Sequence, residues 1–247
     1  MSSAETTAFL TDRWRAAPSR LLAVALLLPF ALGWQATPAR SSEAAVIIPA
    51  PVIDAPQQGR SDTAVLAGGC FWGVQGVFQH VKGVTSAVSG YSGGAAETAH
   101  YNAVGSGRTG HAEAVQITYD PSQISYGRIL QIFLSVVHDP TQFDRQGPDR
   151  GPQYRSAIFP ATPLQRHIAT SYIAQLDQAG VFPQPIVTKT DPLTAFYPAE
   201  GYHQDFLTLN PRHPYIVIND LPKVANLKRL FPDVYRETPV LVTKQGS

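Results

Sequence analysis

The hydrophobic pattern of residues 62–236 alternates between the spacing of strands and that of helices. Strands are favoured at 64–67, 84–91, 112–119 and 156–159, and short strands are also expected at 185–188 and 215–218. Apolar residues three or four apart predict helices over 71–81, 125–137 and 164–176, and a last helix over 222–230. The leading order favours an α+β fold, an α/β two-layer sandwich with a split β-α-β-β-α-β core and helices packed on a mixed sheet.

The first 44 residues have the pattern of a targeting segment. Arg13, Arg15 and Arg20 precede an apolar run at 21–34, which is 14 residues long, whereas a membrane-spanning helix needs roughly 20. We therefore expect residues 1–44 to be a secretory signal peptide and the protein to be exported to the periplasm or another extracytoplasmic space. The alternative is an uncleaved leader that anchors the protein, which is the only membrane contact expected.

The rest of the chain divides into three parts. Residues 45–61 contain three prolines and are expected to be a linker, residues 62–236 to form the catalytic domain, and residues 237–247 to be a C-terminal tail. The chain has 19 Lys and Arg against 18 Asp and Glu, a net charge of +1, which argues against electrostatic binding of nucleic acid.

The chain has one cysteine, Cys70. A single cysteine excludes an intrachain disulfide framework, a four-cysteine zinc site and a Cys-x-x-Cys redox pair. Cys70 lies in Gly68-Gly69-Cys70-Phe71-Trp72, where a strand ends and a helix begins, and the free N–H groups and dipole of a helix start favour a thiolate. The glycines would let a substrate approach, and the two rings would form an apolar pocket. The alternative is an inert buried cysteine.

Two other motifs suggest different chemistry. The Gly-x-Gly-x-x-Gly at 105–110 leads into a strand rather than the helix that a dinucleotide site needs, so it is expected to be a glycine-rich turn. The Gly-x-Ser-x-Gly at 90–94 keeps a serine hydrolase open, with Ser92 as nucleophile and His138, His203 or His213 as base. His111 and Glu113 share one side of a strand, but without a third ligand no metal site is expected. A third alternative is a module that binds methionine-rich peptides without turnover.

A set of ordered motifs resembles the peptide methionine sulfoxide reductase A family. The motifs are GCFW at 69–72, GYSGG at 90–94, GRTGHAEAV at 107–115, YDP at 119–121, QGPDRGPQYRSAIF at 146–159, FYPAEGYHQDF at 196–206 and LPKVANLKRLFPDVY at 221–235. The resemblance covers residues 62–236 and implies an α+β two-layer sandwich. The implied enzyme is a peptide-methionine (S)-S-oxide reductase, an oxidoreductase acting on a sulfur group with a disulfide as acceptor. It would reduce the S epimer of methionine sulfoxide, free or in oxidised proteins, and so repair them.

The resemblance also implies roles for individual residues. Cys70 would attack the sulfoxide sulfur and become a sulfenic acid. Glu113 would give its proton to the sulfoxide oxygen, for which burial must raise the pKa of its carboxyl. Tyr101 and Tyr154 would hold the same oxygen, and Asp149 would organise the site. The substrate-binding residues implied are Phe71 and Trp72, which would cage the methyl group, together with Gly69, Glu200 and His203, the last two expected to orient backbone or tyrosines.

One departure from the family concerns the recycling of Cys70. Many members carry a second cysteine in the loop where this chain has Gly105, or in the C-terminal tail, which here ends Lys-Gln-Gly-Ser. The resemblance is therefore to the one-cysteine type, in which an external thiol of the thioredoxin, glutaredoxin or glutathione type recycles the enzyme and no cofactor is bound. The expected partners are oxidised proteins, free methionine sulfoxide and a thiol reductant protein, with the enzyme a monomer. Export would require a thiol donor outside the cytoplasm.

Overall fold

The computed structural model describes residues 45–242, which belong to one compact unit. The signal peptide or anchor expected over 1–44 and the last part of the expected tail, 243–247, lie outside the described residues. Among the residues that are described, no helix combines the length and the apolar character needed to cross a membrane.

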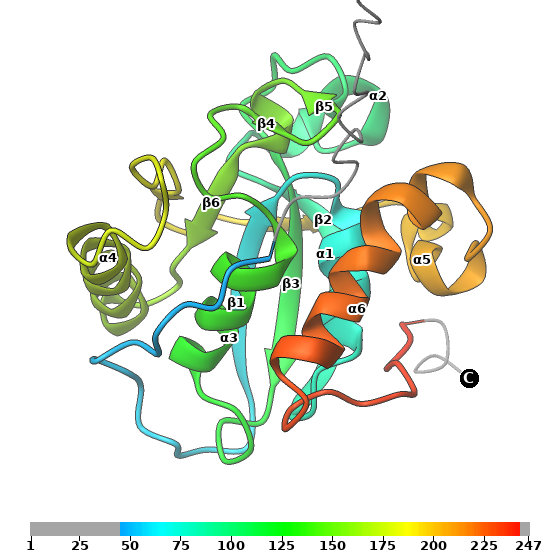
Figure 1. Cartoon of the computed structure of the whole chain (residues 1–247). Coiled ribbons are helices and arrows are strands. Elements are labelled where there is room, and N and C mark those ends of the chain that lie inside the picture. Colours follow the sequence, from blue (N-terminus) through cyan, green and yellow to red (C-terminus); the bar gives the residue numbers. More distant parts are fainter. Residues whose placement is uncertain (1–44, 243–247) are drawn as a thin grey trace, which may run out of the picture. The chain divides into compact units, whose positions relative to one another are not determined.

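A six-stranded sheet forms the centre of the domain, in the order β7-β6-β1-β3-β2-β8 (Figure 1). Its strands are β1 (Asp62–Gly68), β2 (Val84–Ser92), β3 (Ala112–Tyr119), β6 (Ser156–Phe159), β7 (Lys189–Thr190) and β8 (Phe196–Pro198). The β6–β7 pair is parallel and the other pairs are antiparallel, so the sheet is mixed. Because β3 lies between β1 and β2 and is antiparallel to both, β1-α1-β2 is a split βαβ unit. The expected α+β fold is confirmed.

The helices pack mainly on one face of this sheet. They are α1 (Phe71–Gln79), α2 (Tyr101–Val104), α3 (Tyr126–Ile132), α4 (Pro163–Gln178), α5 (Phe206–Leu209) and α6 (Leu221–Leu230). Three short 3₁₀ turns are η1 (Ala96–Thr98), η3 (Pro152–Tyr154) and η4 (Gly201–His203), and two π-helical turns are η2 (Phe133–Val137) and η5 (Ile216–Asp220). A separate pair of two-residue strands, β4 (Arg145–Gln146) and β5 (Asp149–Arg150), forms a small hairpin.

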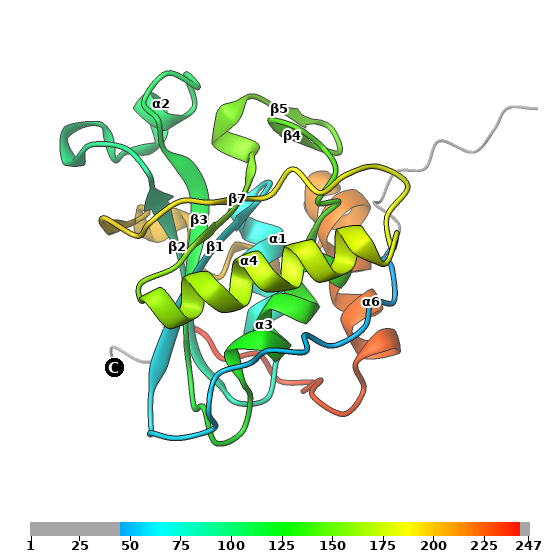
Figure 2. The ribbon, with the colours of Figure 1, turned by 90° about the vertical axis from the view of Figure 1, so that its left-hand side faces the viewer.

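The two faces of the sheet are covered differently. Alternate residues of β1, Ala64 and Leu66, face the main core with α1, α3, α4 and α6, whereas Val65 and Ala67 face a smaller cluster that only the segment around Leu193 and Phe196 covers. Figure 2 shows α4 beside α3, a contact that closes the main core. The helices on one face and the extended segment on the other explain the two-layer architecture.

The expected strand at 215–218 is wrong, because the segment is helical. Its aromatic and β-branched residues favour a strand, but burial follows a helical period instead. Ile216 and Asp220, four residues apart, are buried, while Val217 and Ile218 between them are about half exposed. Likewise, 185–188 is extended without a strand partner, and the pairing with β6 begins only at Lys189.

The helix expected over 125–137 is α3 continued by the π-helical turn η2. Its start is well defined, since the Ser125 side chain accepts a hydrogen bond from the Arg128 backbone N–H at 3.1 Å. The wider π turn delivers the chain to His138 at the end of the sheet where β1 leads into α1.

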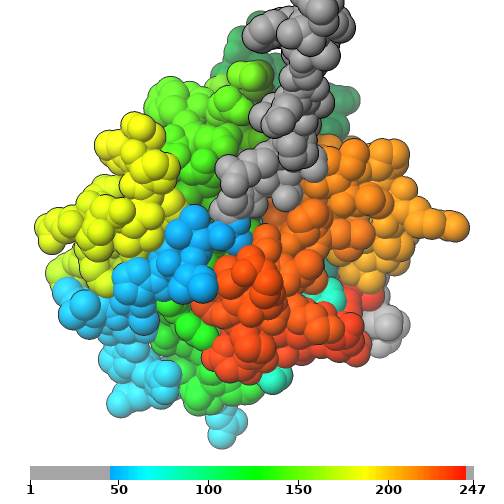
Figure 3. All heavy atoms as spheres, viewed as in Figure 1, coloured from blue at the N-terminus to red at the C-terminus, as the bar shows by residue number. Residues whose placement is uncertain are grey.

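The segment 45–61, expected as a linker, has no helix but is anchored on the domain. Ile48 is 2% exposed and belongs to the main core, and the Tyr172 hydroxyl donates to the Pro49 carbonyl oxygen at 2.6 Å. Figure 3 shows this segment on the surface of the domain, next to α3 and α4. Its polar backbone is therefore satisfied by both helices rather than by solvent alone.

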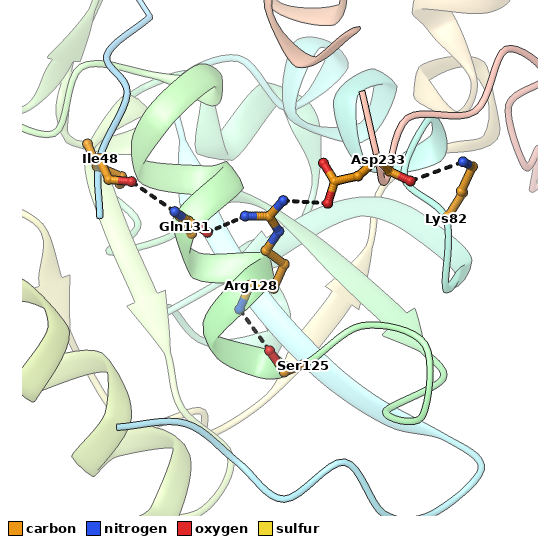
Figure 4. A network of polar contacts seen from close by, with 6 residues as sticks. All are labelled: Ile48, Lys82, Ser125, Arg128, Gln131 and Asp233. Atoms are coloured by element: carbon orange, nitrogen blue, oxygen red, sulfur yellow. Dashed lines mark hydrogen bonds and ion pairs between the residues drawn. The ribbon is translucent and has the colours of Figure 1, made fainter. Parts of the chain in front are cut away.

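Helix α3 ties this segment to the C-terminal part of the chain. Gln131 donates to the Ile48 carbonyl oxygen at 2.8 Å and accepts from the Arg128 guanidinium at 2.7 Å (Figure 4). Arg128 also forms an ion pair with Asp233 at 2.8 Å, and Lys82 donates to the Asp233 carbonyl oxygen at 3.0 Å. Since Asp233 is largely exposed, the ion pair itself contributes only about 0.2–1 kcal/mol.

Candidate active site

Cys70 is the residue that joins β1 to α1. It occupies the N-cap position of α1 and is 9% exposed. Gly69 before it has φ +88°, and a Cβ there would lie 2.7 Å from Cβ of Gln146, while a Cβ on Gly68 would lie 2.9 Å from the Phe133 ring. Both glycines are therefore required by the packing of this chain on itself. The expectation that they make room for a substrate is not supported at these positions.

The surroundings of Cys70 favour the protonated thiol. Burial raises the pKa of Cys70 well above its ordinary value, and the charges of Glu113, Asp220 and Asp149 raise it further. The backbone N–H of Trp72, in the first turn of α1, has the opposite effect on this pKa but is outweighed. The helix start alone had indicated a thiolate, so the correction comes from burial and from three carboxyl groups that the helix argument leaves out.

Glu113 lies next to this cysteine because of the alternation of β3. Glu113 shares the helix-covered side of the strand with Val115 and Ile117, which belong to the main core. It is 4% exposed, and its Oε2 accepts the backbone N–H of Phe71 at 3.1 Å. Burial raises the pKa of Glu113 to about 8 despite that hydrogen bond. At pH 7 the carboxyl group is therefore mostly protonated and able to donate.

Tyr101 and Tyr154 approach the same place from α2 and η3. Burial raises the pKa of both tyrosines, followed by the charge of Glu113, and Cys70 adds to the rise in each. Both hydroxyls are therefore hydrogen-bond donors at neutral pH. Figure 1 shows α2 together with the β4–β5 hairpin beyond one end of the sheet. Tyr101 is 36% exposed, so its ring lies at the mouth of the site.

A cluster of aromatic rings surrounds Trp72, two residues after Cys70. The Trp72 ring is stacked on Phe206, with centroids 3.8 Å apart, and meets Tyr215 edge-on at 5.9 Å. Its indole N–H donates to Nδ1 of His203 at 3.2 Å. The Phe71 ring is buried and lies 5.1 Å from the His203 ring. These contacts fix the orientation of Trp72 beside the cysteine.

Glu200 and His203, expected from the sequence to orient backbone or tyrosines, contact the tyrosines and the indole. One carboxylate oxygen of Glu200 accepts the backbone N–H of Tyr101 at 2.9 Å, and the other accepts the Tyr91 hydroxyl at 2.8 Å. The His203 ring lies between Trp72 and Tyr101, at 4.4 Å from the Tyr101 ring. Glu200 and His203 thus position neighbours of Cys70.

Sequence reasoning missed three residues of this site. The Tyr215 hydroxyl donates to Oδ2 of Asp149, and burial raises the pKa of both groups. Asp220 is fully buried against α1, where a Cβ on Gly73 would lie 2.2 Å from its Oδ1, and Lys223 Nζ lies 3.4 Å from the same oxygen. Burial raises the pKa of Asp220 to about 6. A helical assignment of 216–220 would have put Asp220 on the same buried face as Ile216.

A cavity of about 770 Å³ opens beside Cys70. Its wall includes Cys70, Asp149 and Tyr215 and extends to η2, the β4–β5 hairpin and the segment at Phe182. Glu113, Tyr101 and Tyr154 are not part of this wall. Cys70 therefore has two different environments, one with the buried acid and the tyrosines and one with the cavity.

The geometry does not support the serine hydrolase. Ser92 is fully buried and its hydroxyl donates to the Ala195 carbonyl oxygen at 2.7 Å. The turn that follows is the 3₁₀ segment η1 rather than the helix of a nucleophile elbow. His138 instead contacts Ser156 at 2.6 Å, and His203 accepts from Trp72.

The residues that suggested a dinucleotide site or a metal site have structural roles instead. The glycine-rich segment 105–110 runs directly into β3, as expected for a turn. Both ring nitrogens of His111 form hydrogen bonds with the backbone, one with the Gly94 N–H and the other with the Ala95 carbonyl oxygen. The imidazole therefore holds this loop in place. Within residues 45–242 no group of three or more His, Cys, Asp and Glu side chains is arranged to bind a metal.

Comparison with known proteins agrees with this arrangement. The family model described as peptide methionine sulfoxide reductase matches residues 62–234. The chain belongs to this family. A relative from Mesorhizobium japonicum, named peptide methionine sulfoxide reductase MsrA 2, is 66% identical over 182 residues, covering 74% of this chain and 93% of the relative. A second, from Synechocystis and of the same name, is 50% identical over 191 residues, 76% of this chain and 89% of the relative.

Solved structures of the family share the fold. Methionine sulfoxide reductase A of Corynebacterium diphtheriae has a TM-score of 0.54 and 32% identity, covering 70% of this chain and 88% of that one. Reduced Mxr1 from Saccharomyces cerevisiae has a TM-score of 0.56 and 30% identity, covering 62% and 88%. Family membership makes the chain an oxidoreductase that reduces methionine sulfoxide.

Proposed function

We propose that this enzyme reduces the S epimer of methionine sulfoxide through a sulfenic acid on Cys70. One observation carries the proposal. The buried carboxyl group of Glu113, with a pKa of about 8, accepts a hydrogen bond from the backbone N–H of Phe71, the residue directly after the only cysteine. A nucleophilic sulfur and a proton donor are the two groups that removal of a sulfoxide oxygen requires. Cys70, Glu113, Tyr101 and Tyr154 would act directly on the substrate.

The first step transfers the oxygen to the cysteine. The Cys70 sulfur attacks the sulfoxide sulfur, Glu113 protonates the sulfoxide oxygen, and the thiol proton restores the carboxyl group. The S–O bond of the substrate breaks and an S–O bond forms on Cys70, so that Cys-SH and the sulfoxide give Cys-SOH and methionine. Cysteine is oxidised and methionine sulfoxide is reduced, with no further reactant.

The surroundings of Cys70 support selection of one epimer. The oxygen is held by Glu113, Tyr101 and Tyr154, and the methyl group lies against Phe71 and Trp72. The attacking sulfur fixes a third direction. Three fixed directions around the chiral sulfur allow only one epimer to bind productively. In the other epimer the methyl group would take the place of the oxygen, and the buried donors would lose their hydrogen-bond partner. The S hand follows the family resemblance.

The second half of the cycle requires a thiol from outside the chain. Cys70 is the only cysteine, so a sulfenic acid on it has no internal thiol to attack it. We assign this task to an external thiol of the thioredoxin, glutaredoxin or glutathione type. If residues 1–44 direct export, the donor must act in the periplasm or another extracytoplasmic space. We further propose that the enzyme works as a monomer on free methionine sulfoxide and on oxidised proteins.

Racemic N-acetyl methionine sulfoxide with dithiothreitol tests the proposal. We expect only the S epimer to disappear, and Cys70→Ser to abolish its loss. Ser92→Ala is the control, since Ser92 bonds only a backbone carbonyl, and should keep the activity. Loss of both epimers, or activity in Cys70→Ser, would contradict the proposal. Without dithiothreitol, one methionine per enzyme should form.

A further inference from the structure

We propose that the cavity beside Cys70 is the binding site of the reducing thiol, which is a small peptide thiol carrying carboxylate groups. The inference rests on the proposed function and assigns the second reactant to a different side of the same cysteine. The sulfoxide would bind at Glu113 and the tyrosines, and the thiol would reach Cys70 through the cavity.

The two sides of Cys70 are built from different parts of the chain. Glu113 comes from β3 and the tyrosines come from α2 and η3, whereas the cavity wall is formed by η2, the β4–β5 hairpin, η5 and α6. Apart from Cys70 itself, Asp149 is the residue of the expected sulfoxide site that also lines the cavity. A molecule in the cavity therefore reaches the Cys70 sulfur without passing Glu113.

The chemistry of sulfenic acid reduction needs this arrangement. A thiolate that displaces hydroxide from sulfur approaches along the line of the S–O bond, from the side opposite the departing oxygen. The oxygen on Cys70 was delivered at Glu113, which can protonate it as it leaves. The incoming thiol must therefore arrive from the side away from Glu113, where the cavity opens.

The atoms and electrons of the cycle balance with two thiols. In the first reaction the thiol and Cys-SOH give a mixed disulfide and water, as the S–O bond breaks and an S–S bond forms. A second thiol then attacks the mixed disulfide at the sulfur of the first thiol and releases Cys70 as a thiol. The two external thiols are oxidised to one disulfide. The two electrons that they lose balance the two-electron reduction of the sulfoxide.

The size and charge of the cavity favour a small peptide thiol. A volume of about 770 Å³ lies within the roughly 300–1,000 Å³ of small-molecule sites. Its wall carries the cations Arg145 and Lys223 together with the carboxylates of Asp139 and Asp149, next to the apolar Phe182. A peptide with carboxylates, an ammonium group and a thiol matches such a mixed wall, and a carboxylate can pair with a guanidinium.

Matched variants in η5 and in the β4–β5 hairpin distinguish a change inside the cavity from a similar change next to it. Ile218 lines the cavity and is 47% exposed, while its neighbour Val217 is 48% exposed and does not line it. Ile218→Trp narrows the cavity, and Val217→Trp is its control. Arg145 lines the cavity and Arg150, its partner across the hairpin, does not, so Arg145→Gln is compared with Arg150→Gln.

The two half-reactions are measured separately by rapid quench and mass spectrometry. The first is the reductant-free formation of one methionine per enzyme from N-acetyl methionine sulfoxide. The second is the rate at which glutathione forms a mixed disulfide with the Cys70 sulfenic acid. Ile218→Trp should lower the second rate constant about tenfold and leave the first within about twofold, and Val217→Trp should change neither. Arg145→Gln should slow glutathione about tenfold but not the uncharged 2-mercaptoethanol.

Three outcomes would overturn the inference. If Ile218→Trp slows methionine formation as much as mixed-disulfide formation, the cavity belongs to the sulfoxide. If it slows methionine formation only from a longer oxidised peptide, the cavity holds residues that flank the methionine. If glutathione reacts with all four variants at the wild-type rate while thioredoxin is slowed, the occupant is a protein. Failure of the proposed function is distinct, because the wild-type enzyme would then form no methionine in the first half-reaction.

Discussion

Glu113 and Phe71 are joined by a hydrogen bond of 3.1 Å from the Phe71 backbone N–H to the Glu113 carboxyl group. This contact spans 42 residues of sequence and brings β3 to the first turn of α1, directly after Cys70. The same N–H stabilises the charged form of Glu113, but burial outweighs it and the pKa stays raised, at about 8. The Glu113 carboxyl group is thus held in place by the helix start that carries Cys70.

The first prediction concerns the pH dependence of the chemical step. Since Glu113 must be protonated to donate, and burial raises its pKa to about 8, the single-turnover rate should be steady near pH 6 and fall as the pH rises through about 8. Glu113→Gln should lower the rate by about 10²–10⁴ and remove this fall. Rapid-quench rates between pH 6 and 9 provide the measurement. An unchanged fall in Glu113→Gln would assign it to another group.

The second prediction concerns stability and follows from the same pKa. Burial raises the pKa of Glu113 in the folded state, so folding takes up a proton and the stabilisation is complete below the unfolded pKa, near 4.5. It is lost as the pH rises through the folded value of about 8. Urea unfolding at pH 5 and 8.5 should show wild type losing more stability than Glu113→Gln. Equal losses in the two proteins would contradict this explanation.

The third prediction concerns the hydrogen bond between Tyr215 and Asp149. Tyr215→Phe removes a donor from a buried carboxyl group, an interaction worth about 1.5–3 kcal/mol when the carboxyl is ionised. We expect kcat/KM for N-acetyl methionine sulfoxide to fall about tenfold or more. Tyr235→Phe is the control, because Tyr235 stacks on His80 away from Cys70. A Tyr215→Phe enzyme with wild-type kcat/KM would remove Tyr215 from the site.

The fourth prediction concerns the glycine before the cysteine. Gly69→Ala combines a φ of +88° with a Cβ 2.7 Å from Gln146, so unfolding free energy should fall by about 2 kcal/mol or more. Gly59→Ala isolates the backbone effect, since Gly59 has φ +97° and open space around its Cβ position, and should cost about 1 kcal/mol. Urea unfolding of both variants gives the comparison. Equal losses would mean that the Gln146 contact adds nothing.

Much of this site follows from sequence periodicity. The period of β3 places Glu113 on the same side as Val115 and Ile117, so a carboxyl on the core side could be predicted before its burial was known. The position of Cys70 between β1 and α1 was likewise clear from the pattern. Tyr101 and Tyr154 could be identified only from the family motifs, because no local sequence pattern distinguishes them from other tyrosines.

Tertiary packing decided the rest. The segment 215–218 has the composition of a strand, yet packing of Ile216 and Asp220 against the core makes it a π-helical turn, which brings Asp220 over Gly73. The raised pKa of Cys70 could not be predicted from the helix start, because it depends first on burial and then on carboxyl groups from three distant segments. The anchoring of 45–61 rests on helices more than 70 residues further along the chain, beyond the reach of local patterns.

Cys70 lies between a strand and a helix, and both hold its backbone in place. In the proposed cycle its sulfur would bind hydrogen, then oxygen, then a second sulfur, while the backbone on both sides is held by the β1 ladder and by the first turn of α1. Gln146 fills the space at Gly69 and blocks a shift in that direction. In that cycle both reactants would therefore have to come to a cysteine whose backbone is held on both sides.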